Sequence, residues 1–296
     1  MHKEVNLPLV SVIIAAFNTE RYIDAALTSA INQDYENIEI IVVNDGSTDN
    51  TRKLLEHYLP KIAIIDQPNS GVAHARNAAI KYSSGTYIAF LDSDDIWEPT
   101  KISKQINQLG ELNWAYTDAA YIGEKQTGLE KRSDLSKLYS GSIFQHLLTE
   151  NFITTSSVLI KKELLLEFGC FDENMKVLED WKLWLAIAKK HEISLVSEAL
   201  VKYRVYPMST SRKAREVLPY HLKLLKETFN HLPDSKSNKQ LKVRAVRNSY
   251  NICSYISEDG SDFQFSLYCA AKAMTLQPSF SQFKRLVRTL LNVVTK

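Results

Sequence analysis

The chain of 296 residues is 45% hydrophobic and 24% charged, so it has enough apolar surface to offset chain entropy and is not disordered. Its 9 Gly and 8 Pro exclude a collagen-like or low-complexity protein. No stretch approaches the roughly 20 consecutive apolar residues of a membrane-spanning helix. The net charge of +2 is unevenly distributed: residues 211–296 contain 15 Lys and Arg against 6 Asp and Glu, a balance of +9, and the remainder, with 21 against 28, carries −7.

The start of the chain and its cysteines bear on the cellular compartment. The sequence MHKEVNLPLVSVIIAAF has no small-residue cleavage site, so it predicts a first β-strand and not a signal peptide. The three cysteines, Cys170, Cys253 and Cys269, are far apart and form no CxxC motif. They indicate neither a disulfide framework nor a zinc cluster. We therefore expect a reducing, cytoplasmic setting.

Strand and helix patterns alternate over the first 97 residues. Nearly continuous apolar runs predict β-strands buried on both faces, and apolar residues at helical spacing predict the helices between them. The expected elements, in chain order, are strand 9–16, helix 20–33, strand 38–43, a helix capped by Asp49, strand 62–65, helix 71–82 and strand 87–91. This order predicts an α/β fold with a doubly wound, mostly parallel sheet, right-handed crossovers and flanking helices.

Polar residues follow three of these strands at the point where each strand ends. Phe17-Asn18 follows the first strand, Asn44-Asp45-Gly46-Ser47 the second, and Asp92-Ser93-Asp94-Asp95 the fourth. Each cluster alone suits an ordinary turn. Because ligands of doubly wound sheets bind outside the carboxyl ends of the strands, we expect the three clusters to form one binding site.

The second half of the chain has a more mixed pattern. Residues 123–140 are polar and rich in Gly, Ser and Lys, which predicts a mobile loop. Residues 179–190 (EDWKLWLAIAKK) predict an amphipathic helix whose acidic start and basic end complement the helix dipole. The remaining expected elements are strands 114–122, 155–160, 193–196 and 201–206, and helices 214–231, 237–256, 262–275 and 279–294.

The Asp92-Ser93-Asp94 sequence could bind a divalent cation. Residues i and i+2 of an extended segment point to the same side, so the two carboxylates lie close together and repel each other. Mg²⁺ or Mn²⁺ held by one or two carboxylates and substrate phosphates would relieve that repulsion. The alternative is an acidic turn that caps a helix near Trp97, because such short patterns are common.

Three further residues near the strand ends could contact a nucleotide. Arg76 could bind a phosphate or pair with the acidic cluster, and the alternative is an ordinary surface Arg. Asp45 could accept a hydrogen bond from a nucleobase N–H, or it could only stabilise its turn. Phe17 could stack on a base through its π face, or it could belong to the core.

Four ordered segments within residues 9–97 resemble the N-terminal half of family 2 glycosyltransferases, which have the GT-A fold. The segments are VSVIIAAFN, IEIIVVNDGSTDNT, NSGVAHARNAAI and GTYIAFLDSDDIW. The resemblance continues more loosely through Glu179-Asp180-Trp181 and Tyr203-Arg204, and it fades over the helical tail. It implies a GT-A catalytic domain over 1–210, with nucleotide-sugar binding in 1–97 and an acceptor side in 98–210, and a C-terminal helical extension over 211–296.

The resemblance also implies roles for single residues. The expected nucleotide-sugar contacts are Ala16, Phe17, Asn18, Glu20, Asp45, Asn69, Gly71, Arg76, Asp92 and Ser93. Among them, Asp45 matches an Asp that contacts the nucleobase, and Arg76 matches an Arg that approaches the diphosphate. Two residues depart from the family's common pattern. Phe17 stands where Tyr is frequent, so base stacking is kept but a hydroxyl contact is lost. Asn44 stands where Asp is frequent.

Catalytic and metal-binding roles follow from the same resemblance. Asp92 and Asp94 match the family's metal-binding pair, with Asp94 expected to contact the metal directly, and Asp180 matches the general base. An inverting transfer is an in-line displacement that needs one base on the acceptor side, whereas the metal handles leaving-group charge. Without the resemblance, Asp180 would be interpreted as helix N-terminal charge. The expected acceptor or phosphate contacts are Glu179, Trp181 and Arg204.

The implied activity is that of a Mn²⁺- or Mg²⁺-dependent, inverting hexosyl- or N-acetylhexosaminyltransferase. Its expected donor is a UDP-sugar, because a small pocket with Asp45 suits a pyrimidine N–H, and its acceptor is a glycan or lipid-linked hydroxyl in bacterial surface polysaccharide synthesis. The alternatives are an inactive nucleotide-sugar-binding or scaffold protein and a metal-dependent phosphatase, although the phosphatase motif usually opens its domain. No motif indicates nucleic-acid binding.

The basic tail admits two interpretations. On a helix over 279–294, six apolar residues share a broad face, with Lys284, Arg285 and Arg288 at its edges and opposite side. The six are Phe283, Leu286, Val287, Leu290, Leu291 and Val294. The helix either lies on an anionic membrane, at the inner face of the cell membrane, or packs on the catalytic domain or a second subunit.

Overall fold

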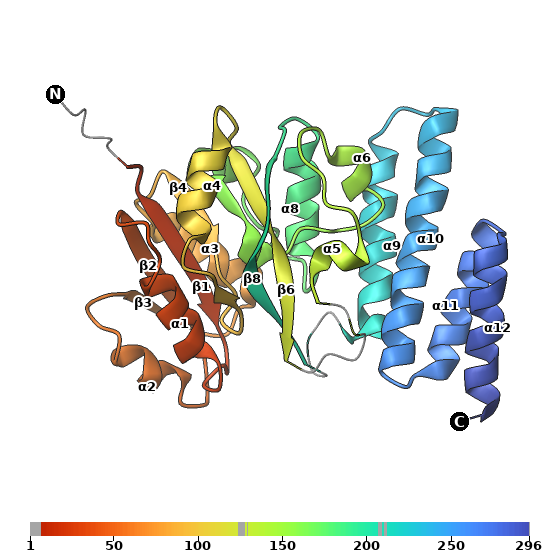
Figure 1. The fold of residues 1–296 in the computed structure, drawn as a ribbon, viewed down its shortest axis with the longest axis horizontal. Helices are drawn as coiled ribbons and strands as arrows, with labels where there is room; N and C mark the ends of the chain where they lie inside the picture. The colour runs from red at the N-terminus through yellow and green to blue at the C-terminus, as the bar shows by residue number, and fades with distance from the viewer. Residues whose placement is uncertain (1–6, 124–127, 129, 207–208, 210–211, 296) are drawn as a thin grey trace. The chain divides into compact units, whose positions relative to one another are not determined.

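Figure 1 shows the computed structural model of the chain, which describes residues 7–123, 128, 130–206, 209 and 212–295. The chain divides into two compact units. The first includes the N-terminal part to Ile122 and Phe152–Arg204, and the second includes Phe144–Asn151 and Val205–Lys296. Within the described ranges, no helix has both the length and the apolar character that crossing a membrane requires.

The first unit is built on one eight-stranded sheet in the order β3-β2-β1-β4-β7-β6-β8-β5. Pairs β3–β2, β2–β1 and β1–β4 are parallel, whereas β4–β7, β7–β6 and β8–β5 are antiparallel. The parallel pairing predicted from the first 97 residues is therefore confirmed. The strands are β1 (Val10–Ala16), β2 (Ile38–Asp45), β3 (Ala63–Gln67), β4 (Tyr87–Phe90), β5 (Ile96–Trp97), β6 (Trp114–Gly123), β7 (Leu159–Lys161) and β8 (Ser194–Val205).

Helices pack on both faces of this sheet (Figure 1). Val10, Val12 and Ile14 of β1 point to one face and share a core with α1 and α4. Phe90 of β4 points to the other face, where its ring centroid lies 5.3 Å from that of Phe171 and 6.2 Å from that of Trp184. Burial on both faces explains the continuous apolar runs of these strands. The helices are α1 (Ile23–Ile31), α2 (Thr51–Glu56), α3 (Val72–Tyr82), α4 (Lys101–Leu109), α5 (Arg132–Leu135), α7 (Lys162–Glu167) and α8 (Glu179–Ala188).

The strand predicted over 155–160 is wrong for its first half. Residues Thr155–Ser157 form a 3₁₀ turn, and only Leu159–Lys161 pair as β7. Hydroxyl side chains compete with strand pairing here, since Ser157 Oγ donates to the carbonyl of Thr154 at 2.6 Å.

Other differences lie in the connections. The strands predicted at 193–196 and 201–206 are one strand, β8, because no Gly, Pro, Asn or Asp interrupts its sequence SLVSEALVKYRV. The short helix α5 forms inside the predicted loop 123–140, of which residues 124–127 and 129 lie outside the described residues. Helices α4 and α7 were not predicted.

The second unit contains the four predicted C-terminal helices, which are confirmed with small shifts of their ends. Helix α10 packs against α9 and α11, and α11 packs against α12. Cys253 and Cys269 lie in their shared core with Leu218, and all three cysteines of the chain are free thiols. The helices are α6 (Phe144–Leu147), α9 (Ala214–Asn230), α10 (Lys236–Asp259), α11 (Phe263–Leu276) and α12 (Phe280–Thr295).

Strand register places the polar clusters at one edge of the sheet. Ile13 of β1 pairs with Ile41 of β2 on one side and with Phe90 of β4 on the other. The three parallel strands therefore run in step and leave the sheet at the same edge, as expected for a ligand site of this architecture.

Replacement of Gly85 tests how tightly β4 is held against β1. A Cβ atom at Gly85 would lie 2.4 Å from Ser11 Oγ and 2.7 Å from Ser11 N, while the Gly85 N–H donates to Ser11 Oγ at 2.9 Å. We expect Gly85→Ala to lower the free energy of unfolding by about 1–3 kcal/mol, because the strand must shift to accept the methyl group. Urea denaturation measures this loss. Gly260→Ala is the control, since its Cβ would lie 3.5 Å from the nearest atom; equal losses in the two variants would contradict the prediction.

Candidate active site

The loops after β1 and β2 are fastened to each other by two of the predicted site residues. Asn18 adopts a left-handed conformation with φ 51°, and its Oδ1 accepts a hydrogen bond from Thr48 N at 2.8 Å. Glu20 Oε2 accepts from both nitrogens of Asn50 at 2.8 Å. Beside them, Phe17 is 45% exposed, so its ring is available for stacking and is not core. These side chains shape the first loop.

Asp45 holds the β3–α3 loop through its carboxylate. Oδ1 accepts from Gln67 Nε2 at 2.7 Å and from Ser70 N at 2.9 Å, and Oδ2 accepts from Gly71 N at 2.9 Å. Three of roughly four acceptor positions of a carboxylate are thus engaged. The structural role of Asp45 is to fix this loop, and contact with a nucleobase stays a prediction for the remaining position.

Close backbone packing supports the same loop. Gly46 has φ 71°, and a Cβ there would lie 2.6 Å from Asn69 N. Gly71, with φ 91°, is the residue before α3. The predicted contacts Asn69 and Gly71 therefore lie directly beside Asp45, and any substitution at Gly46 forces the loop outward.

Arg76 of α3 joins the end of β4 to the start of α8. Its Nη2 donates to Asp92 Oδ1 and its Nη1 to Glu179 Oε1, each at 2.7 Å. The guanidinium carbon lies 5.2 Å from the centroid of the Phe171 ring. Burial opposes the charged form, but the negative charges of Asp92 and Glu179 outweigh it and raise the pKa of Arg76. Arg76 is therefore not an ordinary surface Arg: it pairs with the acidic cluster, and contact with a diphosphate stays a prediction.

The Asp92–Asp95 turn is clamped from two sides. Ser156 Oγ donates to Asp95 Oδ2 at 2.6 Å and accepts from Asp92 N at 3.0 Å. Arg204 N donates to Asp95 Oδ1 at 2.8 Å, and Arg204 Nε donates to the carbonyl of Asp94 at 2.7 Å. Burial, and then the charges of Asp92 and Asp94, raise the pKa of Asp95 well above its ordinary value. Arg204 thus contacts the backbone of the acidic turn.

Asp180 lies in the first turn of α8, which begins after Leu178 in a left-handed conformation with φ 64°. Its Oδ2 accepts from Thr155 Oγ1 at 3.0 Å, and its Oδ1 accepts from Trp181 N at 2.6 Å. Burial, reinforced by the charge of Glu179 and opposed by that of Arg76, raises the pKa of Asp180 to about 6. A carboxylate with this pKa is ionised at neutral pH and is a better proton acceptor than an ordinary Asp.

Some predicted residues contribute backbone but not an exposed side chain. Ala16, Ser93 and Trp181 are at most 6% exposed. Trp181 packs in the interior of the first unit, so its ring is not placed to meet an acceptor. Ala16 ends β1, and Ser93 lies between the two acids of the turn.

The acidic turn suits a metal that is shared with a ligand. No group of three or more His, Cys, Asp or Glu side chains that could hold a metal ion occurs in the part of the chain that the structure describes. Asp92 keeps 30% of its side chain exposed while Oδ1 meets Arg76. Two carboxylates at an open sheet edge fit Mg²⁺ or Mn²⁺, which take oxygen ligands and complete their shell with water and phosphate.

Thr155, Ser156 and Phe171 were not predicted as site residues. The first two contact Asp180 and Asp95, and the third lies against the Arg76 guanidinium. The hydroxyl run Thr154–Ser157 is a signal for local side-chain to backbone bonding that would have identified the turn. Phe171 carries no such signal, because its role depends on tertiary packing.

Comparison with known proteins assigns the chain to a family. The sequence profile described as glycosyl transferase family 2 matches residues 11–168, and the chain belongs to this family. An uncharacterized glycosyltransferase of Rickettsia prowazekii (strain Madrid E) is 35% identical over 223 residues, which cover 72% of this chain and 69% of the relative. The predicted family is confirmed, and the chain is a member of a glycosyltransferase enzyme family.

Two better-described proteins are also similar. The UDP-Glc:alpha-D-GlcNAc-diphosphoundecaprenol beta-1,3-glucosyltransferase WfgD of Escherichia coli is 35% identical over 216 residues, covering 71% of this chain and 82% of WfgD. The mannosyltransferase PcManGT from Pyrobaculum calidifontis, solved in complex with GDP-Man and Mn²⁺, superposes with a TM-score of 0.66 at 15% identity, covering 99% of this chain and 82% of that one. At this identity the likeness shows the fold alone, and it confirms the predicted GT-A fold.

A double-mutant cycle tests the link that Arg76 makes. We expect Arg76→Met to lower the free energy of unfolding by about 3–5 kcal/mol, because it leaves Glu179 and Asp92 without their buried counter-charge. In a Glu179→Gln background the same change should cost at least about 1 kcal/mol less. Urea denaturation of the four proteins gives the coupling.

The exposed pair Lys202–Glu98, at 2.9 Å with side chains 43% and 36% exposed, is the matched control. Its cycle of Lys202→Met and Glu98→Gln should give a coupling below about 1 kcal/mol. Additive effects of the Arg76 and Glu179 substitutions would show that the two side chains do not support each other.

Proposed function

We propose that this chain transfers a hexosyl or N-acetylhexosaminyl group from a UDP-sugar to a hydroxyl of a glycan or lipid-linked acceptor, with inversion, in bacterial surface polysaccharide synthesis. The observation that carries the proposal is the Arg76 bridge, whose two 2.7 Å hydrogen bonds unite the Asp92 turn with Glu179, the neighbour of Asp180. Residues 1–210 would form the catalytic domain and residues 211–296 its extension. An inactive binding protein and a phosphatase are disfavoured, because family membership coincides with a complete set of acids.

Two comparisons support the donor class. The name of WfgD gives UDP-Glc as donor and a diphosphoundecaprenol-linked acceptor, and PcManGT was solved with GDP-Man and Mn²⁺. Both donors are nucleoside diphosphate sugars. In this chain the exposed Phe17 ring and the Asp45 loop flank the edge of the sheet where a nucleoside would bind.

The proposed chemistry needs one proton acceptor and a stabilised leaving group. Asp180, oriented by Thr155 and Trp181 N, takes the proton of the acceptor hydroxyl as its oxygen attacks the anomeric carbon. The bond from that carbon to the diphosphate breaks on the opposite face, which inverts the configuration. Asp92 and Asp94 would hold Mn²⁺ or Mg²⁺, which supplies positive charge for the leaving diphosphate. Arg76 keeps the turn and α8 in place by pairing with both Asp92 and Glu179.

Removal of the Asp94 carboxylate tests the metal site. We expect UDP to bind the wild-type chain in the presence of Mn²⁺ and to bind Asp94→Ala at least about tenfold more weakly, because the metal joins the phosphates to the protein. Calorimetry with UDP and with GDP, each with and without Mn²⁺, measures affinity and base preference. The exposed Asp34→Ala is the control. Equal UDP affinity of Asp94→Ala and wild type at limiting Mn²⁺ would rule out metal binding by Asp94.

Neutralisation of Asp180 tests the base. We expect Asp180→Asn to lower kcat by about 10²- to 10⁴-fold while UDP affinity is kept. In the wild type, kcat/KM should fall about tenfold per pH unit below about 6, because the carboxyl group with a pKa of about 6 takes up a proton and can no longer accept one. The measurement is UDP release from a panel of UDP-sugars at pH 5–8.

The matched control is Asp172→Asn, because Asp172 lies eight residues before Asp180 and pairs with Lys182. This variant should keep the wild-type kcat and the same fall of kcat/KM at acidic pH. If Asp180→Asn instead weakens UDP binding with kcat unchanged, Asp180 contacts the donor and another group is the base.

A further inference from the structure

Helix α12 packs with its polar side inward. Gln282, Arg285 and Thr289 are spaced i, i+3 and i+7, so they share one face of the helix, and they are 9%, 8% and 0% exposed. An ordinary amphipathic helix of a globular protein buries its apolar stripe instead. The sequence placed Arg285 at the edge or on the opposite side of the apolar face; it lies on the opposite side, and that side is the buried one.

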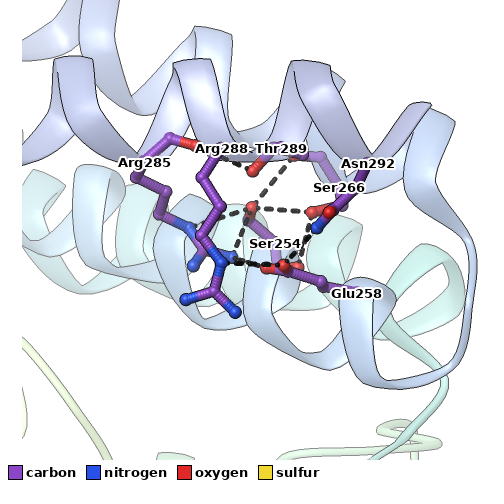
Figure 2. Close-up of polar contacts among 7 residues, drawn as sticks. All are labelled: Ser254, Glu258, Ser266, Arg285, Arg288, Thr289 and Asn292. Carbon is purple, nitrogen blue, oxygen red and sulfur yellow. Dashed lines mark hydrogen bonds and ion pairs between the residues drawn. The ribbon is translucent and has the colours of Figure 1, made fainter. Parts of the chain in front are cut away.

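A buried polar cluster explains this orientation (Figure 2). Glu258 of α10 accepts from Arg285 Nη2 at 3.2 Å through Oε2 and from Asn292 Nδ2 at 2.7 Å through Oε1. Arg285 Nη2 and Nε also donate to Ser254 Oγ at 2.9 and 3.2 Å. Ser254 Oγ in turn donates to the carbonyl of Ser266 in α11 at 3.0 Å.

This cluster fixes the rotation of α12 about its own axis. Side chains of Arg285 and Glu258 are only 7% and 12% exposed. Turning the helix to bury its apolar stripe would separate them and leave Glu258 facing hydrocarbon, which is strongly unfavourable for a carboxylate. The polar contacts of α12 therefore hold its opposite face outward.

The outward face of α12 is a stripe of large apolar side chains. Phe280, Phe283, Val287 and Leu290 are 72%, 52%, 39% and 48% exposed. The spacing of 283, 287 and 290 puts them on one side of the helix, and 280 lies one turn before 283. We call these four residues the α12 stripe. Contiguous exposed apolar side chains on one helix indicate a surface that binds a membrane or another molecule.

Charge decides which partner the α12 stripe suits. Helix α12 contains no Asp or Glu, and residues 211–296 carry a balance of +9. Lys284 and Arg288 border the stripe on one flank; the Arg288 side chain is 70% exposed, and its Nε forms an ion pair with Glu258 Oε1 at 3.4 Å. Two copies of this chain that met through the stripe would bring like charges together. An anionic phospholipid surface offers hydrocarbon for the stripe and negative headgroups for its flank.

We propose that the α12 stripe inserts into the interface of an anionic phospholipid bilayer, with Lys284 at the level of the headgroups. The helix then lies in the plane of the membrane, with the Glu258–Arg285 cluster on its protein side. This proposal goes beyond the transfer reaction and does not depend on it, because it rests on the orientation and the charge of α12.

Vesicle sedimentation of the full chain tests the proposal. Wild-type protein is mixed with vesicles of 70% phosphatidylcholine and 30% phosphatidylglycerol, or of pure phosphatidylcholine, at low and high salt. We expect binding to the anionic vesicles that weakens with salt, and much weaker binding to neutral vesicles. Lys284→Gln should weaken binding to anionic vesicles about fivefold, because each basic residue near such a surface contributes ~1 kcal/mol. Phe283→Glu combined with Leu290→Glu should weaken it at least about tenfold.

Two measurements separate loss of the stripe from loss of the fold. Val243→Glu, at a position on α10 that is 37% exposed, is the matched apolar-to-acidic control and should keep vesicle binding. Circular dichroism melting should give the same Tm for the stripe variant and the wild type. No sedimentation of wild type with anionic vesicles would overturn the proposal, as would unchanged binding of the stripe variant. A concentration-dependent dimer in ultracentrifugation that the stripe variant abolishes would assign the surface to a second copy instead.

Discussion

The Arg76 guanidinium pairs with two carboxylates that lie far apart in the sequence. It is buried with hydrogen bonds to Asp92 and to Glu179, which is 103 residues away. A guanidinium suits this position because its planar fork presents separate N–H groups to two acceptors, whereas an ammonium is a point charge. Removing Arg76 leaves both carboxylates without their counter-charge, and Glu179 is then a buried, unpaired charge. The relative positions of the acidic turn and the first turn of α8, and hence of Asp180, depend on this bridge.

The parallel half of the fold could be predicted because its determinants are local. Runs such as Val10–Ala16 are apolar except for Ser11, since both faces of the strand are covered, and the polar clusters mark where the strands end. The antiparallel half was predicted less completely: β6 matches its expected strand, β8 was expected as two strands, and the short strands β5 and β7 have no such runs. Thr155 illustrates the limit: β propensity favours a strand, but the hydroxyls of this segment bond the nearby backbone and the acids of the site.

In the candidate site, too, the sequence predicted where residues lie but not which groups they contact. The sequence placed Asp45 at the edge of the sheet, and it lies there. Its carboxylate accepts hydrogen bonds from the backbone N–H groups of Ser70 and Gly71. The sequence could not predict these partners, because every non-proline residue carries a backbone N–H donor. The burial that raises the pKa of Asp180 likewise depends on packing across the whole unit.

The polar underside of α12 has a consequence for proteolysis. The side chains that α12 covers on α10 and α11 include Ser254, Glu258 and Ser266, which bond readily to water once uncovered. A cut in the short link between Leu276 and Phe280 would therefore exchange the protein hydrogen bonds of these three side chains for hydration. The released peptide would carry the α12 stripe with it. Cleavage at this link would thus separate an amphipathic helix from the polar patch on α10 and α11 against which it packs.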